Sequence, residues 1–474
     1  MHWLSSPTVR WDRGFFRKLL VVCLPIVIQN LMSASLHIID GVMIGQLGDA
    51  PYAAVTQATR YVFVYQLFLF GLASGCGIFF SQHWGTQDVK SMRRAMGLCF
   101  RGALVLAVLF GGLGLLFPQG VMSIFLPKGE SFGYSIQYLT IVAAGFLITA
   151  VDTVYATCMK SAGKTVIPMT AGICSILTNT FLNWILIYGN LGAPALGVRG
   201  AAIATVAAQL ISTVGCFLYA FVKYPKLRLH REDWQVTLGD MRRHLGQGIP
   251  LGLQFSVLAI GIIVMQSVVV KFDILEGEMI SNAAQNGFGA ANKLNNLLMT
   301  PMNGLGAAMT SYTAQNMGAG QPERIKKGTL QALAMVSILA GISIAIGLGL
   351  SFGGSYLRIF LSVDKVTAET MRYGNTYLYV DLAMYLFLGF IFVVRNCVQG
   401  IGLSRFILGA GTAELLARVA VCLLLPAAFA GGEVTAAAPA ISFYALCAAD
   451  PAAWMAADAV LMIPFLRDIM RKWQ

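Results

Sequence analysis

Long runs of apolar residues, separated by short polar stretches, dominate the pattern along the chain. Twelve runs can be delimited, at about 16–43, 52–83, 92–118, 131–160, 165–189, 197–222, 247–271, 282–315, 327–353, 370–400, 405–430 and 437–466. A helix needs about 20 mostly apolar residues to cross the hydrocarbon core of a bilayer. Because a backbone in lipid must satisfy its own hydrogen bonds, we expect these runs to form twelve transmembrane helices.

The composition narrows the class of protein further. Of the 474 residues, 57 % are apolar and 11 % are charged, whereas ordinary soluble domains have about 25 % charged residues. This excludes a soluble enzyme and a disordered chain. An outer-membrane barrel is disfavoured because its strands alternate with period two. The sequence therefore predicts an all-α polytopic membrane protein.

The positive charges alternate between the two sides of the predicted membrane. The loops on one side, which include both termini and the segment 223–246, hold 22 of the 33 Lys and Arg residues, and the opposite loops hold six. Because cytoplasmic loops carry the excess of Lys and Arg, we expect both termini in the cytoplasm of a multi-pass cell-membrane protein. Topology thus explains the net charge of +12, and we expect no nucleic-acid partner.

The two halves of the chain resemble each other. GLASGCGIFFSQHWG (Gly71 to Gly85) parallels GLGAAMTSYTAQNMG (Gly304 to Gly318), and LPIVIQ from Leu24 parallels IPLGLQ from Ile249. Matches in polar residues, in the same order, make chance similarity a poor explanation. Six spans return the chain to its starting side, so the repeats are parallel.

This repeat predicts two pseudo-symmetric six-helix bundles. We place the N-terminal bundle at 1–222, a basic cytoplasmic linker at 223–246 and the C-terminal bundle at 247–474. No two of the nine cysteines form a CxxC pair, which argues against a metal cluster. We find no catalytic motif, so we expect neither an enzyme nor a bound cofactor or metal.

Several motifs point to one family. The first run reads LPIVIQNLMSASLHIIDGVMIGQLG; a GxxxxxxxFxxQxWG run follows, and NTFLNWILIYG and GAAIAT mark the fifth and sixth runs. In this order, over about residues 15–470, they resemble the bacterial type of the multidrug and toxic compound extrusion (MATE) family. The resemblance implies a secondary antiporter that exports small organic, often cationic, compounds in exchange for inward H⁺ or Na⁺.

Asp40 is the best candidate for the ion-coupling residue, because an acid inside a membrane helix needs a cation, a proton or a polar partner. Asn179 and Asn183 share one helical face and carry oxygens suited to a hard cation. The resemblance places these three residues and Thr205 around one ion or proton site. The alternatives are a solvated, idle Asp40 near the headgroups and asparagines that merely join helices.

The C-terminal half differs from this pattern. Some family members bind Na⁺ through a Glu in the seventh span and an Asp in the tenth, and this chain has neither at the matching position. We interpret Asp381 as lying too early in the tenth span, and expect no second ion site. Arg395, Glu414 and Arg418 form a polar cluster instead. It either locks two helices together or lines a cavity that binds substrate or responds to protons.

Other polar residues and prolines have two interpretations each. Asp152 and Asp458 are intramembrane acids that either bind substrate or protons or are structural. His37 lies one turn before Asp40 and either tunes its protonation or is simply hydrogen-bonded. Pro25 and Pro250 remove a helical hydrogen bond in the first helix of each repeat, which predicts a static or a mobile kink.

The leading functional hypothesis is multidrug efflux by alternating access between the two bundles, carried out by a monomer. A flippase for a lipid-linked glycan is the alternative within the same architecture. A membrane receptor or channel is the alternative of another class.

Overall fold

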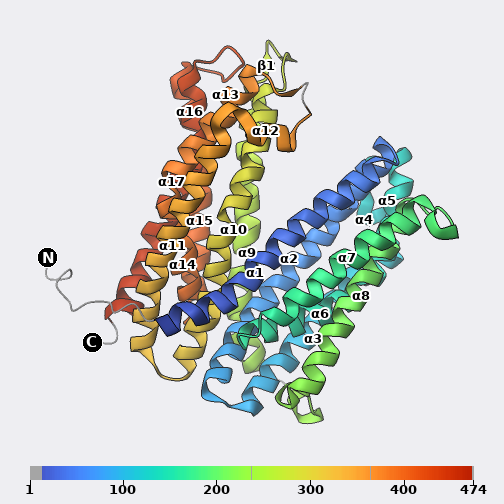
Figure 1. Cartoon of the computed structure of the whole chain (residues 1–474), viewed down its shortest axis with the longest axis vertical. Helices are drawn as coiled ribbons and strands as arrows, with labels where there is room; N and C mark the ends of the chain where they lie inside the picture. The colour runs from blue at the N-terminus through green and yellow to red at the C-terminus, as the bar shows by residue number, and fades with distance from the viewer. Residues whose placement is uncertain (1–12, 236, 363–364, 472–474) are drawn as a thin grey trace. The chain divides into compact units, whose positions relative to one another are not determined.

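The structure, a computed structural model, describes residues 13–235, 237–362 and 365–471. Helices account for nearly all of this part of the chain (Figure 1). Strands β1 (Ile274–Leu275) and β2 (Glu278–Met279) form a small antiparallel hairpin. Glu276 and Gly277 join them with positive φ angles of 50° and 84°, as a type I′ hairpin loop requires.

The first half contains six spans, joined by short helical turns. They are α1 (Arg13–Gly45), α2 (Asp49–Thr86), α3 (Val89–Leu116), α5 (Glu130–Ala144) with α6 (Phe146–Ser161), α7 (Val166–Tyr188) and α8 (Val198–Lys223); the turns are α4 (Pro118–Ser123), η1 (Asn190–Gly192), η2 (Pro225–Leu227) and η3 (Arg231–Trp234).

The second half repeats this order. Its elements are α9 (Leu238–Lys271), α10 (Ala283–Gly318), α11 (Pro322–Ser351), η4 (Phe352–Gly354), α12 (Ser355–Phe360), α13 (Ala368–Ala383) with α14 (Tyr385–Gly400), α15 (Ser404–Ala430), α16 (Ala440–Cys447) with α17 (Ala449–Pro464), and the π-helical turn η6 (Phe465–Arg471). Because α9 begins at Leu238, the second part of the predicted linker is helical.

The prediction of an all-α polytopic membrane protein is confirmed. Within the described ranges, nine helices are long and apolar enough to cross a membrane, and the bent pairs α5–α6 and α13–α14 raise the number to eleven. The twelfth, α10, has 36 residues but carries several asparagines along its length.

Two spans that we expected to be continuous are broken. α5 and α6 meet at Gly145 with a bend of 49°, and α13 and α14 meet at Met384 with a bend of 55°. A Cβ atom at Gly145 would lie 2.9 Å from the Val206 side chain, so a close helix approach favours glycine at this break. Pro25 and Pro250 lie inside α1 and α9, which each remain a single helix, and their role as kinks stays a prediction.

The described residues form two compact units. One is Val22–Gly252, called the N-terminal unit below; the other, the C-terminal unit, joins Leu253 onward with the start of α1. The predicted bundles instead ended at residue 222 and began at residue 247. Their boundaries as moving bodies stay a prediction.

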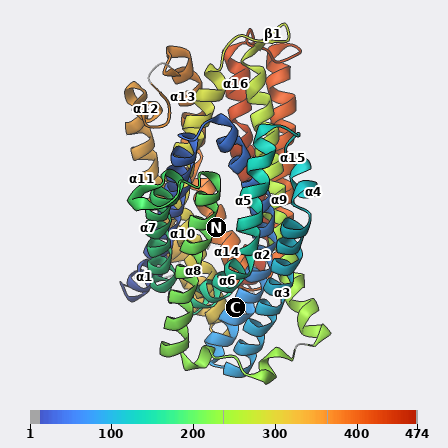
Figure 2. The same ribbon diagram turned by 90° about the vertical axis from the view of Figure 1, so that its right-hand side faces the viewer.

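The N-terminal unit packs α2 against α3, α5 and α6, and α7 against α8 (Figures 1 and 2). Its core contains Tyr65, which is fully buried, stacks on Phe146 at 4.2 Å and donates a hydrogen bond to the Phe146 carbonyl at 2.9 Å. The outer face is apolar: Val105 and Val108 of α3 are 66 % and 64 % exposed. Such a face suits contact with lipid.

The C-terminal unit packs α10 against α13 and α14, and α15 against α17 (Figure 1). Its core also contains buried tyrosines. Tyr356 and Tyr385 are fully buried, and Tyr377 is 2 % exposed. A buried phenol needs a hydrogen-bond partner, so these side chains draw polar groups into the interior of the unit.

Candidate functional site

The four residues predicted for the coupling site lie together in the N-terminal unit. Asp40 comes from α1, Asn179 and Asn183 from α7, and Thr205 from α8. The Asn183 amide donates to Asp40 Oδ1 at 2.7 Å and to Asn179 Oδ1 at 3.0 Å. The Asn179 amide in turn contacts Thr205 Oγ1 at 3.4 Å. One chain of hydrogen bonds therefore connects three helices.

This cluster is buried and keeps unused acceptor capacity. Asn179 and Asn183 are 2 % and 1 % exposed, and Asn183 Oδ1 has no hydrogen-bond partner within the described part of the chain. A buried acceptor without a partner is costly. One carboxylate and the nearby amide and hydroxyl oxygens suit a proton or a hard cation.

The cluster lines a cavity of about 520 Å³ within the N-terminal unit. Asp152 of α6 lines the same cavity and accepts a hydrogen bond from the Ser212 hydroxyl at 3.4 Å. The structure therefore brings Asp152 into the compartment of Asp40, which spacing along the chain did not indicate. The side chain of His37 lies outside the described part of the chain, so the hypothesis that it tunes Asp40 stays a prediction.

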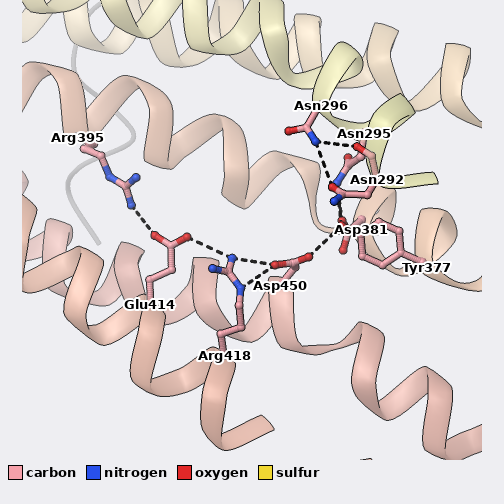
Figure 3. Close-up of polar contacts among 9 residues, drawn as sticks. All are labelled: Asn292, Asn295, Asn296, Tyr377, Asp381, Arg395, Glu414, Arg418 and Asp450. Carbon is pink, nitrogen blue, oxygen red and sulfur yellow. Dashed lines mark hydrogen bonds and ion pairs between the residues drawn. The ribbon is translucent and has the colours of Figure 1, made fainter. Parts of the chain in front are cut away.

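The predicted polar cluster of the second half is a row of alternating charges (Figure 3). Arg395 of α14 pairs with Glu414 of α15 at 2.8 Å, and Glu414 contacts Arg418, one turn later, at 3.3 Å. Arg418 also pairs with Asp450 of α17 at 2.8 Å. Glu414, Arg418 and Asp450 are 5 %, 4 % and 8 % exposed. We call these four residues the charged row; its two cations balance its two anions.

The charged row continues into a second polar group (Figure 3). The Tyr377 hydroxyl donates to Asp450 Oδ2 at 3.0 Å, and the amide of Asn295 contacts the Tyr377 oxygen at 3.4 Å. Asn295 also donates to Asp381 Oδ2 at 2.6 Å, and its own Oδ1 accepts from the Tyr385 hydroxyl. Five helices thus contribute to one buried network.

The structure buries Asp381, whereas its mismatch with the family position of the tenth span stays a prediction. It is fully buried, and it lies at the end of α13, just before the break at Met384 that divides the tenth span. Its Oδ1 has no hydrogen-bond partner among the residues that the structure describes. The expectation that the second half has no ion site therefore stays a prediction, and α9 offers no Glu.

Sequence reasoning missed Asp450, Asn295 and Tyr377. The hydrogen bond between Asn295 of α10 and Asp381 of α13 joins residues far apart along the chain, so no local pattern indicated it. Asp450 lies inside the predicted twelfth span (437–466) but was not singled out there. The sequence analysis identified Asp458 as an intramembrane acid. It is 8 % exposed, and neither of its carboxylate oxygens has a hydrogen-bond partner among the described residues.

A sequence model of the MatE family matches residues 25–185 and 250–424. Among curated relatives, the probable multidrug resistance protein YoeA of Bacillus subtilis is 24 % identical over 406 residues, which cover 84 % of this chain and 82 % of YoeA. The multidrug resistance protein PmpM of Pseudomonas aeruginosa is 25 % identical over 372 residues, covering 76 % of this chain and 72 % of PmpM.

Solved structures share the fold. A crystal structure of MATE in complex with MaL6 superposes with a TM-score of 0.82 at 19 % identity and covers 97 % of both chains. A transporter of the MOP superfamily from Pyrococcus furiosus, described as having a binding pocket of reverse polarity, gives 0.81 at 18 % identity, covering 97 % of this chain and 96 % of that one. The family model spans both halves of the repeat in the predicted order, and the chain therefore belongs to the MATE family of membrane transporters.

Proposed function

We propose that the protein is a secondary antiporter that exports small organic cations, including drugs, in exchange for inward H⁺ or Na⁺. The names of its relatives support drug export, since YoeA and PmpM are named multidrug resistance proteins. The observation that supports ion coupling is the position of Asp40, which lines the cavity and accepts a hydrogen bond from Asn183.

The mechanism follows from competition for one carboxylate. A cation at Asp40 neutralises the acid and removes the cost of an uncompensated charge in the membrane. An organic cation and the coupling ion both gain from this contact, so binding of one favours release of the other. In this scheme the two lobes alternate between inward and outward openings, as parallel-repeat transporters do.

Orientation and assembly complete the proposal. Both termini lie in the cytoplasm, as the distribution of Lys and Arg indicates. The N-terminal unit contains its own cavity, so a monomer suffices for function.

The polarity of the cavity favours organic cations over the flippase alternative. A lipid-linked glycan carries a pyrophosphate, which needs positive charge. Among the described side chains that line the cavity, two are carboxylates and none is Lys or Arg. Arg395 and Arg418 are each paired with an acid of the charged row.

Everted membrane vesicles test this function. A fluorescent organic cation is supplied, and a pH gradient and a Na⁺ gradient are imposed separately. We expect one gradient to drive uptake into the vesicles, which identifies the coupling ion, and we expect Asp40→Asn to abolish it. The matched control is Asp49→Asn, which alters an exposed acid at the start of α2 and should behave as wild type. Normal driven transport by Asp40→Asn would refute the proposed coupling.

A further inference from the structure

The N-terminal cavity holds two carboxylates that are not equivalent. Asp40 comes from α1 and is held by an amide donor at 2.7 Å. Asp152 comes from α6, and its hydrogen bond from Ser212 is long, at 3.4 Å. Thr213 also approaches Asp152. Since an ionised carboxylate accepts up to about four hydrogen bonds, Asp152 retains capacity for a ligand.

The charge of the cavity lining is negative. Neither Lys nor Arg occurs among the described side chains of the lining, whereas both carboxylates do. Lys160, two turns after Asp152 on α6, attracts this carboxylate electrostatically but does not line the cavity. Among its described residues, the lining therefore presents two acids and no base to a bound cation.

The uncharged groups of the cavity specify the kind of cation. Gln29 Oε1 is buried in the N-terminal unit and has no hydrogen-bond partner within the described ranges, and Gln29 lines the cavity. Asn183 Oδ1 is a second acceptor of this kind. Such oxygens need N–H or O–H donors, which primary ammonium and amidinium groups have and quaternary ammonium groups lack.

We propose that Asp152 binds the second cationic group of an organic dication. The cavity then takes compounds with two N–H-bearing cationic groups, such as diamines and bis-amidines, with one group at Asp40 and the other at Asp152. The inference rests on the proposed function, because it takes this cavity as the binding site of the exported compound. Asp40 is shared between substrate and coupling ion, whereas Asp152 serves the substrate alone.

Binding to the purified full-length protein tests the role of Asp152. The probes are an aromatic bis-amidine and the mono-amidine with the same aromatic core, measured by calorimetry in detergent at one pH. For Asp152→Asn we expect the Kd of the bis-amidine to rise at least about tenfold, because one charge-assisted hydrogen bond is lost. The Kd of the mono-amidine should change less than about twofold on the same scale.

Two further variants separate charge from folding. Asp152→Glu keeps the charge and should restore the preference for the bis-amidine, whereas Asp49→Asn should leave both Kd values unchanged. The proposal is overturned if Asp152→Asn weakens both probes equally or weakens neither. Gradient-driven export in vesicles is scored separately: its absence in wild type would refute the antiporter function even where the binding preference is found.

Discussion

At the scale of single residues, Asn183 determines how Asp40 is presented. Its amide bridges Asp40 and Asn179, so Asn183→Ala removes two hydrogen bonds while the acid stays in place. A hydrogen bond to a charged group contributes about 1.5–3 kcal/mol. We therefore expect the maximal rate of ion-driven export to fall about tenfold or more, measured in vesicles at matched protein levels.

Asn190→Ala is the control for this change. Asn190 follows the same helix, and its amide donates to the Trp184 carbonyl in an exposed loop, away from the cavity. Its export rate should stay near that of wild type. Full-rate export by Asn183→Ala would mean that the position of Asp40 does not depend on this amide.

Arg418 stabilises two acids at once. Its guanidinium pairs with Asp450 at 2.8 Å and with Glu414 at 3.3 Å, so Arg418→Met leaves both carboxylates buried with less compensation. Breaking a buried ion pair from one side costs about 3–5 kcal/mol. We expect a loss of unfolding free energy of about this size in SDS titration.

The comparison for Arg418 is the exposed ion pair of Arg372 with Glu369. Their side chains are 58 % and 55 % exposed at a distance of 3.5 Å. Arg372→Met should cost less than about 1 kcal/mol, because water screens such pairs. Equal losses in the two variants would show that the charged row does not stabilise the C-terminal unit.

The sequence revealed those contacts of the site whose two residues lie close together along the chain. Asn179 with Asn183, and Glu414 with Arg418, are one helical turn apart, so periodicity alone indicates their contacts. Asp450 contacts Arg418 from a helix 32 positions further on, and no local pattern encodes such a contact. Long-range polar pairs become visible only when the packing of helices is known.

At the scale of elements, helix α3 begins at a defined cap. Asp88 Oδ1 accepts the Ser91 backbone N–H at 3.1 Å, and hydrogen bonding to Ser91 lowers the pKa of Asp88 below its ordinary value of 3.8. A carboxylate with a lowered folded-state pKa stabilises the protein above its unfolded pKa and loses this effect as the pH falls through the folded value. Asp88→Ala should therefore cost up to about 1 kcal/mol at pH 7 and much less near pH 3.

Asp88→Asn separates the two parts of this effect. Asparagine still caps a helix but does not titrate in this range. We expect the unfolding free energy of Asp88→Asn to change less between pH 7 and pH 3 than that of the wild type. The same pH dependence in both proteins would assign the effect to other acids.

Helices α2 and α9 approach each other through glycines. A Cβ atom at Gly75 would lie 2.6 Å from the Gly248 Cα, where only backbone is available to move. Gly112 of α3 has open space at the same position, with no atom of the described residues within 4 Å. We expect Gly75→Ala to destabilise by about 1–3 kcal/mol and Gly112→Ala to be neutral or stabilising by up to about 1 kcal/mol, as measured by SDS titration. A stable Gly75→Ala protein would mean that this crossing tolerates separation.

The sequence predicted the helices better than their breaks. Apolar runs at 131–160 and 370–400 resemble continuous spans, because nothing in a hydropathy pattern marks a bend of 49° or 55°. Asp381 lies at the end of α13, just before the second break, and the hydropathy pattern gave no sign of this position.

At the scale of the whole molecule, the two repeats share an order of helices but differ in their buried charges. The N-terminal unit has a cavity with two acids and, among its described lining, no base. In the C-terminal unit, two arginines balance two acids of the charged row. A cavity lined by acids suits reversible cation binding, whereas the balanced charges of the row suit a fixed arrangement of the helices that carry them.

The sidedness of this asymmetric molecule can be measured directly. Eight of the nine cysteines are buried, so Cys174→Ser provides a background with little labelling. We expect Gly129→Cys, before α5, to react with an impermeant maleimide in intact cells, and Gln235→Cys, before α9, to react only after permeabilisation. The physical reason is the excess of Lys and Arg around Gln235, which holds that loop in the cytoplasm. The reverse pattern would place the termini outside and would refute the orientation predicted from the Lys and Arg residues.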